Sequence, residues 1–259
     1  MKNGRGGVLA DITIGRYVAR SSVVHALDPR TKTLAALAIS ISMLQGATLP
    51  GTAWHLALAF GSVGLARLPW RFVVRSARPF AWLVGIVFAT HLLVGGIGAW
   101  RTGLALAGRL LAMVAVASLL SWTTQPLSMV AGLRSLGSPL ARIGLPVDAG
   151  ATAVGLALRF APIALSEAQT ILRAQAARGA DFRGMRRKLA LVVPMLGALF
   201  ERAFARAEVL AEAMESRGYS PEVRRTNYRA LGWKTQDLVA AVVVLLWIAC
   251  AIMVDRGIW

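Results

Sequence analysis

The chain has 259 residues, of which 56% are hydrophobic, and its mean hydropathy is +0.60. This composition excludes an ordinary soluble domain and is typical of a polytopic membrane protein. The net charge of +17 at pH 7 could also indicate nucleic-acid binding. We expect no nucleic-acid partner, however, because the basic residues lie where a membrane protein keeps them, in cytoplasmic segments. The single cysteine, Cys250, excludes an internal disulfide.

Residues 1–32 are charged throughout and lack a long apolar core, so they predict a cytoplasmic N-terminal segment without a cleavable signal peptide. Five apolar runs follow, each of about 17–21 residues, which is near the length that a helix needs to cross a bilayer. They cover residues 33–49, 52–68, 80–100, 103–122 and 238–254. The arginine-rich connection at 67–78 should be cytoplasmic, and the turns at Pro50 and Trp100 should lie outside.

The stretch from 123 to 234 differs from the rest, because it holds 16 of the 29 basic residues. Its two moderately apolar pieces are residues 147–165 and 189–200. Helices of this mixed kind lie at a membrane surface or project from it, and whether 147–165 spans the bilayer stays open. The predicted fold is therefore all-α, with about five or six membrane helices plus cytoplasmic amphipathic coupling helices. The expected segments are 1–32 (cytoplasmic), 33–122 (membrane helices), 123–234 (coupling region) and 235–259 (C-terminal membrane helix).

Two helical patterns in the coupling region end in the same way, with a small residue, an arginine and a glycine. Glycine just past a helix adopts the left-handed cap conformation at no side-chain cost, and a cation in the last turn favours the helix dipole. Simple capping would explain one such end. Two ends together favour a docking role, in which an exposed arginine pairs with a partner carboxylate. The two ends are Ala177-Arg178-Gly179 and Ser216-Arg217-Gly218.

The two patterns follow Pro162 and Pro194, and the second one is clearly amphipathic. Apolar residues recur at intervals of three and four between Leu196 and Met214, which predicts a helix with a buried stripe. Glutamates occupy another face and predict a side exposed to water. They are Glu201, Glu208, Glu212 and Glu215.

A further motif, Asp28-Pro29-Arg30-Thr31-Lys32, precedes the first apolar run. Asp28 can cap a helix that begins at Pro29, and Arg30 and Lys32 would anchor its cytoplasmic end. The alternative is a contact with a partner protein.

Three polar residues fall within the apolar runs. His55 and His91 are expected to be hydrogen-bonded packing residues rather than ligands. Arg109 should face the interior of the bundle or reach the outer interface near Trp100, because a charge in lipid is costly.

Absent motifs restrict the function further. The membrane segments carry no Asp or Glu, although proton-coupled transporters usually need one there. The sequence also lacks a Walker-type phosphate loop, H-E-x-x-H, G-x-S-x-G and any pair of cysteines. We therefore expect no catalytic residue, no metal site and no cofactor on this chain.

Several motifs occur in a familiar order: G-R-Y and H-A-L-D-P-R-T-K before the first run, T-T-Q-P after the fourth, then L-R-F-A-P, A-Q-A-A-R-G-A-D-F and A-E-A-M-E-S-R-G-Y. Over residues 14–219 the chain resembles the T component, the transmembrane coupling subunit, of energy-coupling factor (ECF) importers. The resemblance implies that two ABC ATPase subunits bind the ATP and dock on Arg178 and Arg217. It also implies that a small membrane S component captures the vitamin or metal ion. Ser216 departs conservatively from the family's usual alanine.

The resemblance implies a location in a prokaryotic cell membrane and a chain that is not itself an enzyme. The nearest alternative is a conventional ABC importer permease that lines the substrate path itself. An autonomous secondary transporter or channel and a membrane enzyme are more distant alternatives. The sequence does not identify the transported compound.

Overall fold

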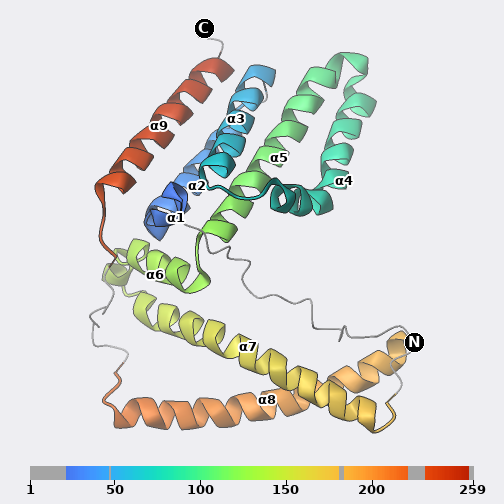
Figure 1. Cartoon of the computed structure of the whole chain (residues 1–259), viewed down its shortest axis with the longest axis vertical. Helices are drawn as coiled ribbons and strands as arrows, with labels where there is room; N and C mark the ends of the chain where they lie inside the picture. Colours follow the sequence, from blue (N-terminus) through green and yellow to red (C-terminus); the bar gives the residue numbers. More distant parts are fainter. Residues whose placement is uncertain (1–21, 47, 181–183, 221–230, 257–259) are drawn as a thin grey trace. The chain divides into compact units, whose positions relative to one another are not determined.

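The computed structural model describes residues 22–46, 48–180, 184–220 and 231–256, and within these ranges all regular structure is helical (Figure 1). The all-α prediction is therefore confirmed. The helices are α1 (Val23–Ala26), α2 (Pro29–Met43), α3 (Leu49–Leu65), α4 (Trp70–Gly95), α5 (Trp100–Thr123), α6 (Pro126–Leu136), α7 (Val147–Ala177), α8 (Met185–Ser216) and α9 (Thr235–Asp255), with 3₁₀ turns at Ile97–Ala99 and Leu140–Ile143.

The chain divides into two compact units. The first, called the bundle unit here, combines Gly15–Leu136 with Arg229–Trp259 and so contains α1–α6 and α9. The second, called the crossed-helix unit, contains α7 and α8 within Gly137–Tyr228.

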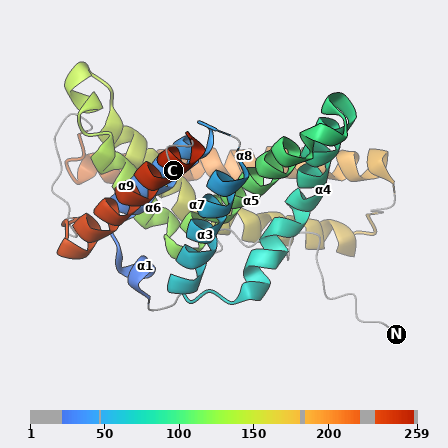
Figure 2. The ribbon, with the colours of Figure 1, turned by 90° about the horizontal axis from the view of Figure 1, so that it is seen from above.

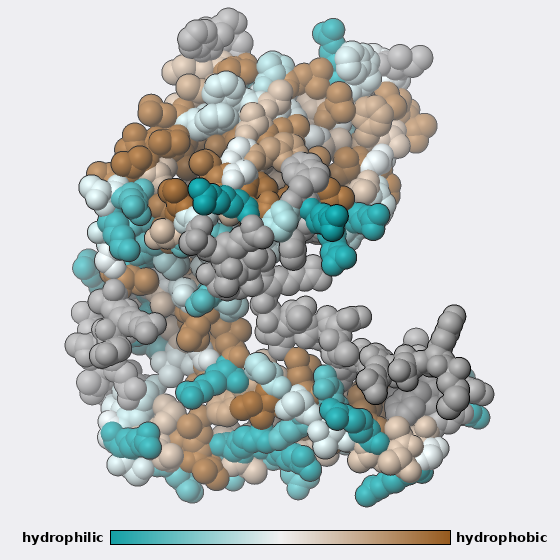
Figure 3. Space-filling model, in the orientation of Figure 1, coloured by the Kyte–Doolittle hydropathy of each residue, from teal (hydrophilic) through white to brown (hydrophobic). Residues whose placement is uncertain are grey.

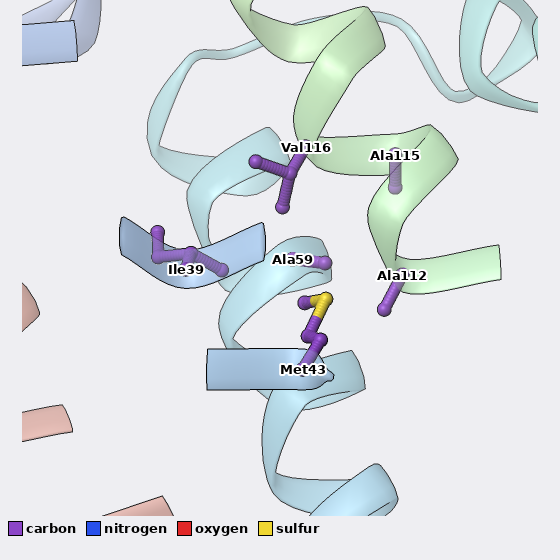
Figure 4. Close-up of a cluster of buried hydrophobic side chains, with 6 residues drawn as sticks. All are labelled: Ile39, Met43, Ala59, Ala112, Ala115 and Val116. Carbon is purple, nitrogen blue, oxygen red and sulfur yellow. The ribbon is translucent and has the colours of Figure 1, made fainter. Parts of the chain in front are cut away.

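Within the bundle unit, α2 and α3 lie between α9 and α5, and α4 packs on the outer side of α5 (Figures 1 and 2). Small residues allow the close approach: Ala112 and Ala115 of α5 meet Ala59 of α3, and Ile39 and Met43 of α2 close the cluster (Figure 4). On the α9 side, the rings of Trp54 and Trp247 stack with centroids 4.5 Å apart.

Some helix boundaries differ from the predicted ones. Pro50 and Gly51 lie in the first turn of α3 and do not form a turn between helices, because Thr48 caps the helix and proline suits its first positions. The arginine-rich connection is largely helical too. Arg71, Arg75 and Arg78 are exposed residues at the start of α4, ahead of its apolar part.

Four helical segments in the described ranges are long and apolar enough to cross a membrane: Ala77–Gly95, Trp100–Thr123, Val147–Ala177 and Thr235–Asp255. The expected count was five or six. The difference comes from α2 and α3, which have 15 and 17 residues and would extend only about 22 and 26 Å along a bilayer core of about 30 Å. Apolar side chains cover much of the visible surface of the bundle unit, as a membrane protein requires (Figure 3).

The crossed-helix unit consists of two long helices rather than two short ones. α7 has 31 residues and α8 has 32, and Pro162 and Pro194 lie inside them. The prediction that these prolines precede the helices is therefore wrong. An interior proline costs about 3 kcal/mol, and burial of neighbouring residues offsets this cost. Ala168 and Met195, which follow the two prolines, are both buried, and α7 and α8 pack against each other.

Candidate functional site

The two Arg-Gly ends have the same backbone geometry. The amide of Gly179 donates to Ala176 O (3.0 Å), and the amide of the following Ala180 donates to Gln175 O (3.0 Å). At the end of α8, the corresponding bonds from Gly218 and Tyr219 are 2.8 and 2.9 Å long. Both ends are thus Schellman motifs, with φ of 81° at Gly179 and 71° at Gly218. The caps predicted from the sequence are present.

These caps leave the arginines at exposed helix tips. Arg178 and Arg217 are the last residues before the left-handed glycines, both are exposed, and neither forms an ion pair within the described part of the chain. The neighbouring Ala177 and Ser216 are exposed and small. The Ser216 hydroxyl donates to Ala213 O at 3.1 Å, so it is satisfied by its own helix and resembles alanine toward an approaching surface.

The two tips are far apart because they lie at opposite ends of α8. Arg178 ends α7 a few residues before α8 begins, whereas Arg217 follows its last residue. A helix of 32 residues is about 48 Å long. An ion pair between Glu167 of α7 and Arg206 of α8 and a hydrogen bond from Gln175 Nε2 to Leu191 O (3.4 Å) hold the two helices together.

The apolar stripe of α8 is not buried within the crossed-helix unit, where a buried stripe was expected. Leu196 is 44% exposed, and Phe200 and Phe204, whose rings stack on each other, are 61% and 67% exposed. Leu189 and Val193 extend the same exposed stripe toward the N-terminus of α8. The four glutamates are exposed, as predicted.

The Asp28 motif joins the beginnings of two helices. Asp28 caps α2 by accepting from the Arg30 amide (2.9 Å), as predicted, and Pro29 is the first helical residue. The amide of Asp28 donates to Asp237 Oδ1 (2.7 Å), and Asp237 Oδ2 accepts from the Lys234 amide (2.9 Å). Asp237 is 1% exposed and ties the start of α9 to the start of α2.

Lys32 does not anchor the helix end at the membrane surface, as the sequence suggested, because it is buried. Only 8% of Lys32 is exposed, and its Nζ donates to the carbonyl oxygens of His25 (3.1 Å) and Thr123 (3.0 Å). The residue precedes the predicted first span, which begins at residue 33. Burial lowers the pKa of its ammonium group to about 8, although Asp237 and Asp28 oppose this shift. Arg30 is half-buried and donates to Leu231 O (3.4 Å).

Arg109 faces the bundle interior, which is the first of the two predicted alternatives. Its Nη2 contacts both carboxylate oxygens of Asp255 (2.7 and 2.6 Å), Nη1 donates to Met43 O (2.8 Å) and Nε donates to Thr52 Oγ1 (3.2 Å). The two side chains are 3% and 8% exposed. Thr48 Oγ1 also donates to Asp255 Oδ1 (2.5 Å).

Sequence reasoning missed Asp237 and Asp255 because they flank the last apolar run, 238–254, by one residue on each side. An acidic residue directly at each end of an apolar run was the sequence signal that could have identified them. His55 behaves as predicted: it is 1% exposed and bonds Gly51 O (2.8 Å) and Ser42 Oγ (3.0 Å). The described residues contain no group of three or more His, Cys, Asp or Glu that could hold a metal ion.

Helices long enough to cross a membrane, together with polar contacts fixed inside the bundle, define a polytopic, all-α membrane protein. The family model described as "Cobalt transport protein" (CbiQ) matches residues 20–228. The chain therefore belongs to this family, and it is also similar to transmembrane proteins of energy-coupling factor transporters.

Three such relatives are similar over nearly their whole length. The energy-coupling factor transporter transmembrane protein EcfT of Thermanaerovibrio acidaminovorans is 39% identical, with 95% of this chain and 97% of the relative covered. The EcfT proteins of Bacillus selenitireducens and Bacillus subtilis are 35% and 32% identical, each over 95% of this chain and over 97% and 98% of the relative. The chain is a multi-pass transmembrane component of an ECF transporter in a prokaryotic membrane.

Proposed function

We propose that this chain is the non-catalytic coupling subunit of its transporter, and that Arg178 and Arg217 each dock one ABC ATPase subunit. The observation that carries the proposal is the pair of equivalent Schellman ends, each presenting an exposed arginine beside a small residue. Such an arginine can enter a partner's groove and form a bidentate, charge-assisted contact with a carboxylate. ATP binds to the partner subunits, so this chain carries no cofactor.

The spacing of the two arginines suits two separate partners. α8 alone extends about 48 Å, so one partner domain at each tip can dock without blocking the other. When ATP binding draws the two ATPases together, each tip moves with its host. The contact between α7 and α8, including the Glu167–Arg206 pair, passes this movement from one helix to the other.

The exposed stripe of α8 supports the other half of the mechanism. Phe200, Phe204 and Leu196 form an apolar surface that the crossed-helix unit leaves exposed and that is costly to leave in water. We assign this surface to the S component, the membrane subunit that captures a vitamin or another micronutrient. Movement of the tips then tilts the S component and its bound substrate.

The test is co-purification and uptake after charge reversal at the tips. The full chain is co-expressed with ABC ATPase subunits and an S component from the same genome, carrying Arg178→Glu, Arg217→Glu or both. Each single variant should weaken ATPase capture by about tenfold or more, because a buried charged contact is worth about 1.5–3 kcal/mol. The double variant should abolish ATP-driven uptake.

Matched controls are Arg159→Glu on α7 and Arg202→Glu on α8, because both arginines are exposed but lie several turns from the tips. These controls should capture the ATPases as well as the unmodified chain does. Normal assembly and uptake in the Arg178/Arg217 double variant would refute the proposal. Uptake by the chain and ATPases without any S component would favour the conventional permease instead.

A further inference from the structure

Two cavities in the bundle unit share lining residues, among them Lys32. One has a volume of about 460 Å³ and is bordered by α1, the start of α2 and the start of α6; His25, Thr124 and Ser128 are among its lining residues. The other, of about 140 Å³, is almost entirely apolar and lies among α2, α3, α5 and α9. Leu27, Lys32 and Thr123 line both cavities. The larger cavity falls in the range of ligand pockets, about 300–1,000 Å³.

The larger cavity has the chemistry of an anion site. An ammonium group carries three N–H donors, and Lys32 uses two of them on the carbonyl oxygens of His25 and Thr123. One donor is left on a charged side chain that is more than nine-tenths buried. The carboxylates of Asp28 and Asp237 do not line the cavity and accept from backbone amides.

Two further observations point to the same ligand. Leu127 and Ser128, in the first turn of the 11-residue helix α6, line the cavity, and a helix N-terminus favours a negative charge. Thr124, at the end of α5, is 4% exposed, and its hydroxyl has no hydrogen-bond partner among the described residues. A buried hydroxyl without a partner is costly and is accounted for if a ligand oxygen bonds it.

The apolar cavity decides the class of anion. Inorganic phosphate would occupy the larger cavity alone, whereas Ala36, Ile39 and Val116 line a space suited to hydrocarbon. We propose that the two cavities together bind one anionic phospholipid, with its phosphate at Lys32 and the start of α6 and part of one acyl chain in the apolar cavity. The site lies next to the segment predicted to be cytoplasmic, and the cytoplasmic leaflet is the one rich in anionic lipids.

The test counts lipids that stay bound to the full chain. The protein is purified in a mild detergent and incubated with equal amounts of phosphatidylglycerol and phosphatidylcholine. Native mass spectrometry then measures the mass of the protein with its bound lipids. The unmodified chain should retain one phosphatidylglycerol in preference to phosphatidylcholine. Thr124→Val, which keeps the side-chain shape, should lower this retention about threefold to tenfold, and Lys32→Met should abolish it.

A filled apolar cavity separates the lipid from a free anion. Ala36→Leu should reduce phosphatidylglycerol retention and leave the Lys32 contacts intact, while Thr152→Val on α7 is a matched control that should change nothing. If Lys32→Met does not fold, Thr124→Val and Ala36→Leu decide the outcome. Equal retention of both lipids would overturn the proposal. So would unchanged retention in the Thr124 and Ala36 variants, or displacement of the lipid by excess inorganic phosphate.

Discussion

Replacing Arg109 by methionine should destabilise the bundle unit strongly. Arg109 on α5 is paired with Asp255 at the end of α9, and it also bonds the backbone of α2 and a side chain of α3. The substitution removes this junction of four helices and leaves the Asp255 carboxylate, 8% exposed, with its charge unpaired. Breaking a buried ion pair by removing one partner typically costs about 3–5 kcal/mol.

A double-mutant cycle separates the free-energy cost of Arg109→Met into the part due to the Arg109–Asp255 pair and the part due to lost packing. Asp255→Leu alone leaves the guanidinium unpaired and should cost a similar amount. The double variant Arg109→Met/Asp255→Leu leaves no buried charge and should cost less than the sum of the two single variants, by about 2 kcal/mol or more. Arg101→Met is the control, because Arg101 lies on the same helix but is exposed beside the ring of Trp100.

The assay is reversible unfolding of the full chain in mixed micelles, followed by tryptophan fluorescence. Arg101→Met should change the free energy of unfolding by less than about 0.5 kcal/mol. If the costs of Arg109→Met and Asp255→Leu simply add in the double variant, Arg109 and Asp255 do not act as a pair in stabilising the bundle unit.

Three further outcomes are expected. Ser216→Ala should leave ATPase capture and uptake within about twofold of the unmodified chain, because the serine hydroxyl only bonds its own helix; a large loss would show that the hydroxyl contacts a partner. Glu167→Gln should lower stability by only about 0.2–1 kcal/mol, yet it should reduce the uptake obtained per ATP hydrolysed. Exchanging the charges of residues 167 and 206 should restore this ratio. A ratio of uptake to hydrolysis that stays constant in Glu167→Gln would count against transmission through this pair. Phe200→Ser with Phe204→Ser should weaken S-component co-purification about tenfold or more while ATPase capture persists; unchanged S-component capture would place its surface elsewhere.

Local features were predictable from sequence because short-range chemistry controls them. The left-handed glycines at 179 and 218, the cap at Asp28 and the helix starting at Pro29 depend on residues a few positions apart. The G-R-Y motif at 15–17 and the residues just after Ala180 lie outside the described ranges, so their predictions stay untested. The docking roles of the two arginines also stay predictions, because they depend on partner chains.

Helix extents were less predictable where a local rule competes with packing. Proline normally marks a helix boundary, yet Pro162 and Pro194 lie inside α7 and α8, where tertiary contacts between the two helices outweigh the local cost. The stripe on α8 shows the opposite limit. Its spacing predicted an apolar face, but periodicity does not tell which surface covers that face, and the crossed-helix unit by itself leaves Phe200 and Phe204 exposed.

The sequence by itself determined the membrane class, the helical fold and the two arginine tips, since these follow from composition, hydrophobic periodicity and capping residues. Only the tertiary structure decided the partners of the buried carboxylates. Asp237 accepts from the Asp28 amide, 209 residues away along the chain, and Asp255 pairs with Arg109, 146 residues away, so no local pattern links them. The physical reason is that desolvation makes an unpaired buried charge costly. Its partner is therefore the group that helix packing brings close, whatever their separation in sequence.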